Sequence, residues 1–458
     1  MNPITIQYSQ SSLILKNIPQ ELCDDFNLTF DPRTLEHKIP AIEYKSFLLK
    51  AREKNIQIID NARNYNKLKL TFKHSITPRE HQAKALKAWI EKERRGVVSL
   101  PTGAGKTILA VLAMEITQRS TLIIVPTIDL LHQWENTLTQ FFSEKIGCLG
   151  GGKKDYQNIL VATYDSARMI IESKGNNFGL LIVDECHHLP ARHNRIIAES
   201  AIAPFRLGLS ATVERSDGQE ELLYSLLGPM AYEAKIKEMV SNVLAPYDII
   251  NINAKLNDQE KQSYDLNRNI YLNFLRQKKI NFSIKGAWQQ FIARASQSAE
   301  GRKALSAYRE QKKIPQWAAD KFHKLWEIIC SHTHDSMIIF TDDNSIAYKL
   351  GKELILPVLT HKTKPSERKK FLEAFRSGQL KILLTSKVLN EGVDVPEASV
   401  GVVFSGSGAV REHVQRLGRI LRHTPGKRAT LYEIITKDTN EKNIQERRRQ
   451  HHAYQKSP

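Results

Sequence analysis

Cysteine is scarce in this sequence, and long apolar runs are missing from it. The four cysteines among 458 residues form no C-x-x-C pair, and their spacing argues against zinc and iron–sulfur sites, which need clustered thiolates. They are Cys23, Cys148, Cys186 and Cys330. No apolar stretch approaches the roughly 20 residues of a membrane span, and no basic segment leads into an apolar run as in a secretory signal. We therefore expect reduced thiols and a soluble protein of the cytoplasm or nucleoid, with no membrane partner.

Acidic residues are in deficit. Lys and Arg number 67 against 49 Asp and Glu, which gives a formal charge of +18 at pH 7. A polyanionic partner such as nucleic acid would explain this surplus, because each cation that meets a phosphate releases counterions. A basic surface without such a role would explain it equally well. The length allows two or three domains of ordinary size.

Short apolar runs alternate with helical patterns along most of the chain, which is typical of parallel α/β sheets with buried strands. The first series of runs is Gly96–Leu100, Thr121–Val125, Ile159–Ala162, Leu180–Val183 and Leu207–Leu209. The second series is Tyr247–Ile252, Ser336–Phe340, Ile382–Thr385, Val400–Phe404 and Ala429–Ile434. We therefore expect a small N-terminal domain (1–75), an α/β domain (76–235) and a second α/β domain (236–458).

A polar insert at 257–316 interrupts the second series and is predicted to be helical. Between Arg268 and Lys313 it has eleven Lys or Arg against two acids, Glu300 and Glu310. Its aromatic residues are Tyr271, Phe274, Phe282, Trp288, Phe291 and Tyr308. An element that grips or separates nucleic-acid strands would need such cations and rings. The core of a small helical bundle explains most of the rings, and strand binding explains most of the charge. The tail, 441–458, is basic and predicted to be flexible.

A glycine-rich loop with a Lys-Thr pair follows one of the apolar runs and precedes a helical pattern. Gly103 and Gly105 allow backbone N–H groups to approach a phosphate chain, and a helix N-terminus adds its positive end. Lys106 would supply a cation for the β- and γ-phosphates of ATP, and Thr107 a hydroxyl for Mg²⁺. Leu100 stands where the strict phosphate-loop pattern has glycine. The predicted nucleotide-binding loop is Thr102, Gly103, Ala104, Gly105, Lys106 and Thr107.

Two adjacent carboxylates end another apolar run. Asp184, at the predicted strand end, is suited to hold Mg²⁺ through water, and Glu185 to orient the attacking water. Such a pair is common on solvated loops. It becomes informative here because a phosphate loop lies upstream in the same series of strands and helices.

Three arginines, Arg416, Arg419 and Arg422, follow Gln415 at helical spacing in the second α/β domain. Guanidinium groups in that pattern are suited to reach a transition-state phosphate across a cleft. A basic surface helix would show the same spacing. We predict catalytic roles for Gln415, Arg419 and Arg422.

Together these motifs resemble those of superfamily 2 helicases, in the family's order from Thr77 to Arg422. The resemblance implies two tandem RecA-like domains. It implies nucleotide contacts for Arg79, Gln82 and Asp394. It implies coupling roles for His187, Ser210 and Thr212, and nucleic-acid contacts for Thr127, Thr163 and Thr385.

Within that superfamily the sequence is most similar to the xeroderma pigmentosum group B type helicases and their archaeal relatives. The segment from Leu100 to Thr107 is similar to that branch's phosphate loop. The segments 30–34 and 40–44 resemble its small leading domain, which recognises distorted DNA. The insert stands where the branch has a thumb-like element. The likeness implies ATP-driven 3′-to-5′ movement on single-stranded, forked or distorted DNA, with repair or duplex opening as the role and a nuclease as a possible partner.

Other functions remain open on the residues alone. An RNA helicase, a branched-DNA annealing translocase and a restriction-type translocase subunit would carry the same motifs. A nucleic-acid scaffold with an inactive ATPase is disfavoured, because Lys106, Asp184, Glu185 and Arg419 fill every expected role.

Overall fold

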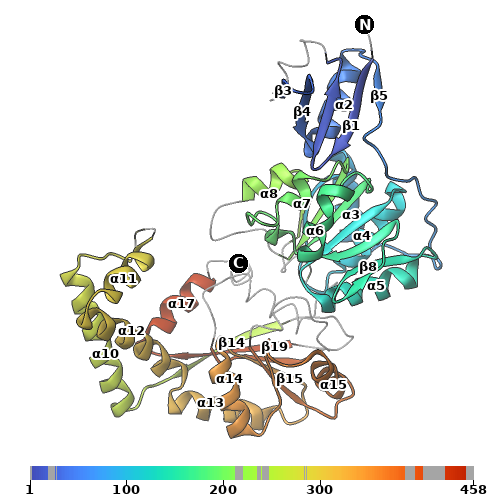
Figure 1. Ribbon diagram of the computed structural model, residues 1–458. Helices are drawn as coiled ribbons and strands as arrows, with labels where there is room; N and C mark the ends of the chain where they lie inside the picture. The colour runs from blue at the N-terminus through green and yellow to red at the C-terminus, as the bar shows by residue number, and fades with distance from the viewer. Residues whose placement is uncertain are drawn as a thin grey trace. The chain divides into compact units, whose positions relative to one another are not determined.

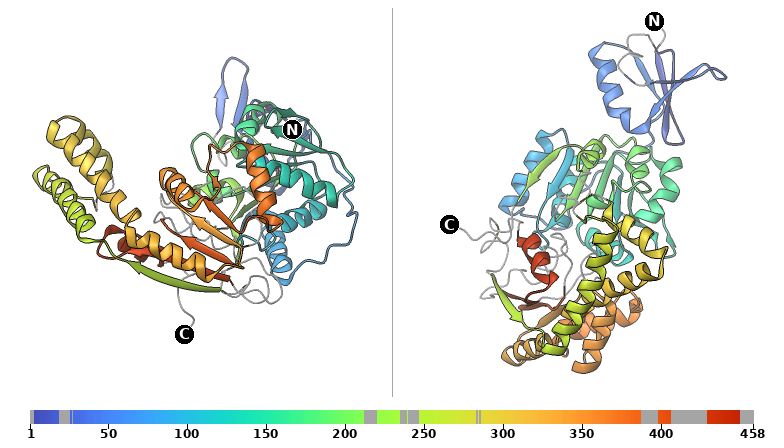
Figure 2. Two further views of the ribbon diagram at one scale, coloured as in Figure 1. Left: turned by 90° about the horizontal axis from the view of Figure 1, so that it is seen from below. Right: turned by 90° about the vertical axis from the view of Figure 1, so that its left-hand side faces the viewer.

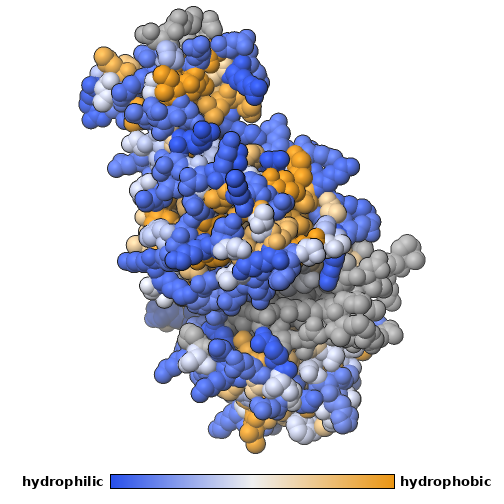
Figure 3. Space-filling model, turned by 90° about the vertical axis from the view of Figure 1, so that its right-hand side faces the viewer, coloured by the Kyte–Doolittle hydropathy of each residue, from blue (hydrophilic) through white to orange (hydrophobic). Residues whose placement is uncertain are grey.

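The computed structural model describes residues 3–18, 26, 28–211, 220–234, 239, 247–282, 284, 286–386, 398–405 and 429–449. The chain divides into two compact units, one containing Met1–Met239 and the other beginning at Val240. Each unit has its own sheets and helices (Figure 1). None of the helices in the described ranges is long and apolar enough to span a membrane. On the face drawn in Figure 3, hydrophilic residues cover most of the coloured surface and apolar ones gather in small patches.

The first unit begins with a five-stranded sheet of order β3-β4-β2-β1-β5. Its strands are β1 (Ile4–Ser9), β2 (Ser12–Lys16), β3 (Thr29–Asp31), β4 (Glu36–Pro40) and β5 (Ile58–Asp60). The pairs are antiparallel except β1 with β5. Alternate side chains such as Ile4 and Ile6 are buried against Phe47 of helix α2 (Tyr44–Glu53). One face of the sheet is thus covered, as period-two alternation predicts.

The second sheet of this unit has eight strands in the order β13-β6-β12-β11-β7-β10-β8-β9. Its strands are β6 (Arg95–Ser99), β7 (Thr121–Val125), β8 (Ile146–Gly150), β9 (Lys153–Lys154), β10 (Ile159–Thr163), β11 (Leu180–Asp184), β12 (Phe205–Ser210) and β13 (Met230–Glu233). All pairs are parallel except the β8–β9 hairpin. Every residue of β7, β10 and β11 is buried, which explains why these strands read as unbroken apolar runs. The predicted parallel α/β fold is confirmed.

Helices connect these strands. They are α3 (Glu80–Glu91), α4 (Lys106–Thr117), α5 (Ile128–Phe141), α6 (Tyr164–Lys174), α7 (Ile196–Glu199) and α8 (Glu220–Leu227), with the short 3₁₀ turn η2 (Cys186–His188). A second 3₁₀ turn, η1 (Ala41–Glu43), leads from β4 into α2. The two sheets of the unit are tied by Tyr8, whose hydroxyl donates to the carbonyl of Ser200 at 2.8 Å. The Ser200 hydroxyl in turn donates to the hydroxyl of Ser11 at 2.7 Å.

The second unit contains a six-stranded, all-parallel sheet of order β14-β19-β18-β15-β17-β16. Its strands are β14 (Tyr247–Ala254), β15 (Met337–Phe340), β16 (Val358–Leu359), β17 (Ile382–Thr385), β18 (Val400–Val403) and β19 (Ala429–Thr436). Helices α13 (Ala319–Ser331), α14 (Asn344–Leu354) and α15 (Pro365–Arg376) connect them. The predicted second parallel sheet is confirmed.

The insert forms three helices, α10 (Asp258–Gln277), α11 (Ala287–Ser296) and α12 (Ala299–Gln316). Figure 2 shows α10 and α12 side by side, extending away from the sheet of their own unit. Tyr271, Phe274 and Phe291 are buried between these helices. The prediction that most of the insert's rings form a bundle core is confirmed. Trp288 and Phe282 remain about two-fifths exposed.

The start of the C-terminal tail corrects the sequence prediction of a flexible segment. Residues Asn440–Arg449 form helix α17 instead. The reason is a buried ion pair, in which the ammonium of Lys321 lies 2.7 Å from the carboxylate of Glu441. Glu441 also accepts a hydrogen bond from the backbone N–H of Thr436 at 2.9 Å. Two charged groups brought out of water need such partners, and they fix the helix to the end of β19.

Candidate active site

The glycine-rich loop lies between the end of β6 and the start of α4. Gly103 and Gly105 have φ angles of 87° and 81°, in the left-handed region that favours glycine. A Cβ atom on Gly105 would lie 2.3 Å from the Nε2 atom of Gln82. Backbone geometry therefore favours glycine at both positions, and close approach adds to the requirement at Gly105. The loop leads directly into the helix N-terminus at Lys106, as a phosphate site requires.

Leu100, which stands where the strict loop pattern has glycine, has a structural role directly after β6. Its side chain is fully buried, and its N–H donates to the carbonyl of Ser210 at 3.0 Å. Its own carbonyl accepts a hydrogen bond from the ammonium of Lys106 at 3.2 Å. The predicted cation thus lies folded back on its own loop, where a phosphate would compete for it.

The loop is held from behind by two residues of α3. The Gln82 amide donates to the carbonyl of Gly105 at 3.2 Å and accepts from the N–H of Arg79 at 2.9 Å. His81, which sequence reasoning missed, lies with Nε2 at 2.8 Å from the carbonyl of Ala104. Both side chains are buried. The structure therefore places Gln82 as a support of the phosphate loop, in addition to the nucleotide contact that the resemblance implies.

Asp184 ends β11 and is buried. Its carboxylate accepts the indole N–H of Trp134 at 2.9 Å and the N–H of Glu185 at 3.0 Å. Burial raises the pKa of Asp184, and the positive charge of Lys106 opposes that rise. Trp134, on α5, is another residue that sequence reasoning missed. A buried tryptophan needs an acceptor for its N–H, but the sequence alone does not indicate which one.

Glu185, His187 and Ser210 form a connected line. Glu185 has a φ of 46°, and its carboxylate lies 3.5 Å from Nδ1 of His187. The same Nδ1 lies 3.1 Å from the hydroxyl of Ser210, at the end of β12. His187 is fully buried. The structure thus brings together the predicted catalytic glutamate and two predicted coupling residues.

The three threonines predicted to bind nucleic acid lie at the carboxyl ends of strands. Thr127 and Thr163 begin α5 and α6, after the neighbouring strands β7 and β10. Their hydroxyls cap those helices by accepting backbone N–H groups. Thr385, at the end of β17, is fully buried, and its hydroxyl donates to the carbonyl of Ser386 at 3.1 Å.

Five predicted site residues lie outside the described residues. They are Thr212, Asp394, Gln415, Arg419 and Arg422. Their roles remain predictions from the sequence.

The donor chemistry of the site fits Mg²⁺. The carboxylate of Asp184 and the hydroxyl of Thr107 are hard oxygen donors of the kind this cation prefers. Each Asp184 oxygen accepts one hydrogen bond and so retains lone-pair capacity for a metal-bound water.

Comparison with known proteins agrees with this geometry. A family model described as "Type III restriction enzyme, res subunit" matches residues 75–215, and a model of the ERCC3/RAD25/XPB C-terminal helicase matches residues 302–456. A DNA 3′-5′ translocase named XPB2, from Sulfurisphaera tokodaii, is 39% identical over 410 residues, which cover 90% of this chain and 93% of the relative. The chain belongs to the XPB family of superfamily 2 helicases.

Other XPB-family proteins are longer. A DNA 3′-5′ helicase XPB of Mycobacterium tuberculosis is 30% identical over 358 residues, covering 75% of this chain and 58% of the relative. Among solved structures, the Hef helicase domain of Pyrococcus furiosus superposes with a TM-score of 0.52 at 18% identity, over 80% of this chain and 97% of that one. This last likeness bears on the fold alone.

Proposed function

We propose that the chain is an ATP-dependent DNA translocase or helicase that moves 3′ to 5′. The observation that carries this proposal is the connected arrangement of the phosphate loop, Asp184 and the Glu185–His187–Ser210 line. Leu100 of the loop donates to the carbonyl of Ser210, and Glu185 donates its N–H to Asp184. This arrangement provides a loop that could hold phosphates and a carboxylate, Glu185, that could orient the attacking water. His187 links this carboxylate to Ser210 at the end of β12. The XPB2 relative, which matches over nearly its whole length, is named for movement on DNA in this direction.

Within the first unit, each chemical role has a side chain. Lys106 would leave the carbonyl of Leu100 for the β- and γ-phosphates of ATP. Thr107 and Asp184 would hold Mg²⁺, which supplies charge neutralisation at the phosphates when it is bound. Glu185 would orient and polarise the attacking water.

The remaining catalytic roles fall to predicted residues outside the described ranges. We propose that Arg419 and Arg422 stabilise charge on the transferring phosphoryl group, with Gln415 beside them and Asp394 near the ribose. Hydrolysis and phosphate release would remove the charge that the arginines meet, and we propose that this change drives stepwise movement along the strand.

DNA contacts are proposed at two places. Thr127 and Thr163 lie where parallel sheets bind ligands, beyond the carboxyl ends of neighbouring strands. The insert contributes its eleven cations against two acids between Arg268 and Lys313. Such contacts read charge and shape without sequence preference, as a motor needs.

The test is ATP turnover and strand separation on matched forked, flapped and bubbled DNAs and their RNA counterparts, at stated salt. We expect stimulation by DNA well above that by RNA. Stimulation by RNA alone would replace this proposal with an RNA-remodelling function. Reannealing of branched DNA without unwinding would identify an annealing translocase. Damage recognition by 1–75 and a nuclease partner stay predictions.

A further inference from the structure

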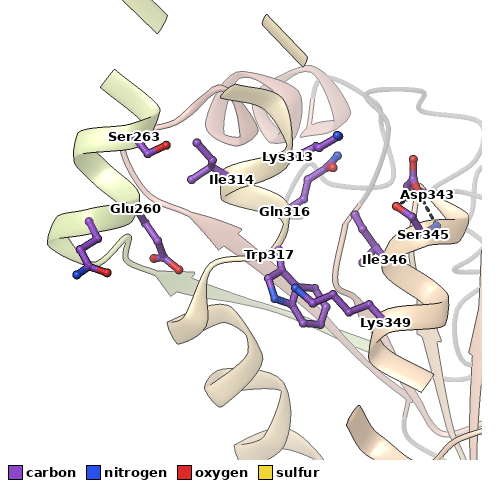
Figure 4. Close-up of a pocket in the computed structure, with 11 residues that line it drawn as sticks. Glu260, Ser263, Lys313, Ile314, Gln316, Trp317, Asp343, Ser345, Ile346 and Lys349 are labelled. Atoms are coloured by element: carbon purple, nitrogen blue, oxygen red, sulfur yellow. Dashed lines mark hydrogen bonds between the residues drawn. The ribbon is translucent and has the colours of Figure 1, made fainter. Parts of the chain in front are cut away.

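A cavity of about 570 Å³ lies within the second unit, where the insert joins the sheet domain (Figure 4). This volume is in the range of small-ligand sites, which run from about 300 to 1,000 Å³. It is lined by residues of α10, by the end of α12 and by α14. Ile314 and Ile346 are among its apolar walls, and Trp317 supplies an aromatic surface. Of the cations proposed above to contact DNA, Lys313 lines it, and none of the described ATP-site residues does.

The two acids in the lining are engaged in holding the fold together. Glu260 accepts the N–H of Asn257 and the N–H of Ala319, each at 2.9 Å. Asp343 caps the start of α14 by accepting the N–H of Ser345 at 2.6 Å. Hydrogen bonds from Ser345 lower the pKa of Asp343. The two carboxylates thus fix the starts of α10, α13 and α14.

The two lysines in the lining are placed differently. Lys313 is exposed, and its ion pair with Glu310 is on the surface, with side chains 68% and 51% exposed, so the pair contributes little. The ammonium of Lys349 lies 3.7 Å from the centroid of the half-buried Trp317 ring, and Figure 4 shows the two side chains lying against one another. Lys349 thus places a positive charge directly on the aromatic surface.

The cavity also lies at the edge of the sheet where parallel α/β folds bind ligands. Trp317 packs on the ring of Phe404, directly after β18, with centroids 6.3 Å apart. The carbonyl of Pro315 accepts the hydroxyl of Thr436, the last residue of β19, at 2.7 Å. Asp343 lies between the end of β15 and the start of α14. All three points mark the carboxyl ends of strands.

We propose that this cavity binds one unstacked base of a DNA strand, with the base on the Trp317 ring. Without DNA, Lys349 covers that ring. When a base enters, it takes the place of the ammonium on the aromatic face, and Lys349 moves to a flanking phosphate while Lys313 meets another. Base–aromatic stacking beside cations is how single strands are held without sequence preference. The inference rests on the proposed function, because it assumes that the insert binds DNA. It adds that the cavity beside the insert holds the strand by one base.

The experiment is a scan in which an abasic nucleotide replaces each position of a short oligothymidine strand in turn. Affinity is measured for the full chain without ATP. Wild-type protein should lose affinity about five- to 150-fold at one position, the range for one stacked base. Trp317→Leu should bind the intact strand more weakly by the same factor and show no further loss at that position. Trp317→Phe should show an intermediate loss. Trp326→Leu, at an exposed tryptophan of α13 outside the cavity, should keep the wild-type profile.

A profile in Trp317→Leu that matches the wild-type profile would overturn the proposal. If Trp317→Leu does not fold, Trp317→Phe decides instead. An affinity loss at the sensitive position as large in Trp317→Phe as in wild-type protein would overturn the proposal in the same way. A second measurement uses wild-type protein alone. A strand with 5-iodouracil at the sensitive position should photocrosslink to the peptide that contains Trp317, and a crosslink confined to any other peptide would contradict the assignment.

Other outcomes separate this inference from the proposed function. DNA-stimulated ATP turnover together with a flat abasic profile removes only the base site. Absence of both DNA binding and stimulation removes the proposed function as well. Binding of free thymidine monophosphate that depends on Trp317, with a flat abasic profile, would assign the cavity to a mononucleotide instead. ATP turnover without DNA should be unchanged in Trp326→Leu.

Discussion

Nδ1 of His187 lies 3.1 Å from the hydroxyl of Ser210. His187 follows β11 and Ser210 ends β12, and these two strands are neighbours in one parallel sheet. His187 also approaches the Glu185 carboxylate at 3.5 Å. The contact therefore connects the residue proposed to orient water with the strand end that leads to Ala211. A connection of this kind is suited to transmit the state of the nucleotide, because packed side chains with discrete arrangements carry coupling.

Ser210→Ala tests this connection. We expect ATP turnover to stay within about fivefold of wild type, since one hydrogen bond contributes about 1 kcal/mol. DNA movement should fall further than turnover, so that more ATP is consumed per nucleotide moved. Parallel measurements of phosphate release and translocation give that ratio. A ratio equal to that of wild type would remove the coupling role. Ser225→Ala, on exposed α8 surface, is the control.

Lys106→Ala should abolish ATP hydrolysis. Loss of a preorganised cation at the phosphates costs at least about a hundredfold in turnover. Steady-state phosphate release with saturating DNA measures it. Lys84→Ala removes a lysine from an exposed pair with Glu80 and should leave turnover unchanged. Normal hydrolysis by Lys106→Ala would show that the phosphate site is wrongly assigned.

Trp134→Phe should weaken the binding of Mg²⁺ at Asp184 while keeping the core packed. It removes the N–H that donates to Asp184 and keeps an aromatic ring. Loss of a partner of a metal-binding carboxylate costs about 10- to 100-fold in metal affinity. The concentration of Mg²⁺ at half-maximal turnover should rise accordingly.

The same variant makes a prediction about pH. Burial already raises the pKa of Asp184, and the Trp134 hydrogen bond opposes that rise. Removing the donor raises the pKa further, so a larger fraction of Asp184 is protonated at a given acidic pH. The acid limb of the turnover profile should move to higher pH. Trp326→Phe is the matched control, and an unmoved limb in Trp134→Phe would contradict the assigned role of Asp184.

Arg419→Ala and Arg422→Ala should retain ATP binding. Turnover should fall by about three to five orders of magnitude, as for arginine fingers in other phosphoryl-transfer enzymes. Nucleotide affinity by equilibrium titration and single-turnover hydrolysis separate the two effects. Weak binding with unchanged hydrolysis of bound ATP would argue against a transition-state role.

Lys321→Met should destabilise the second unit by about 3–5 kcal/mol, because it leaves Glu441 without its buried partner. Urea unfolding followed by a probe in this unit measures the change. Lys324→Met removes a surface pair with Glu327 on the same helix and should cost less than about 1 kcal/mol. Equal losses in the two variants would contradict the structural role given to the Lys321–Glu441 pair.

Much of the fold followed from the sequence. Strands such as β7 and β11 were predictable because burial on both faces leaves unbroken apolar runs. The positions of Lys106 at a helix start and of Asp184 at a strand end were predictable from their spacing next to apolar runs. The catalytic roles of Lys106, Asp184 and Glu185 stay predictions.

What was missed depends on contacts between segments distant in sequence. Trp134 lies 50 residues before Asp184, and His81 lies 23 residues before Ala104. Neither residue carries a local pattern that names its partner. The helix at 440–449 was predicted to be flexible because its charges suggest a solvated tail, whereas Glu441 is paired with Lys321, 120 residues before it. Pairing of buried charges is decided by the tertiary fold.

Directional movement on DNA tests the central proposal most directly. Streptavidin is bound to a biotin at either end of a single DNA strand, and its ATP-dependent displacement is timed for wild-type protein and Lys106→Ala. The account predicts rapid displacement from the 5′ end by the wild type alone, and little from the 3′ end. Displacement from the 3′ end, displacement that needs no ATP, or equal displacement by Lys106→Ala would contradict it.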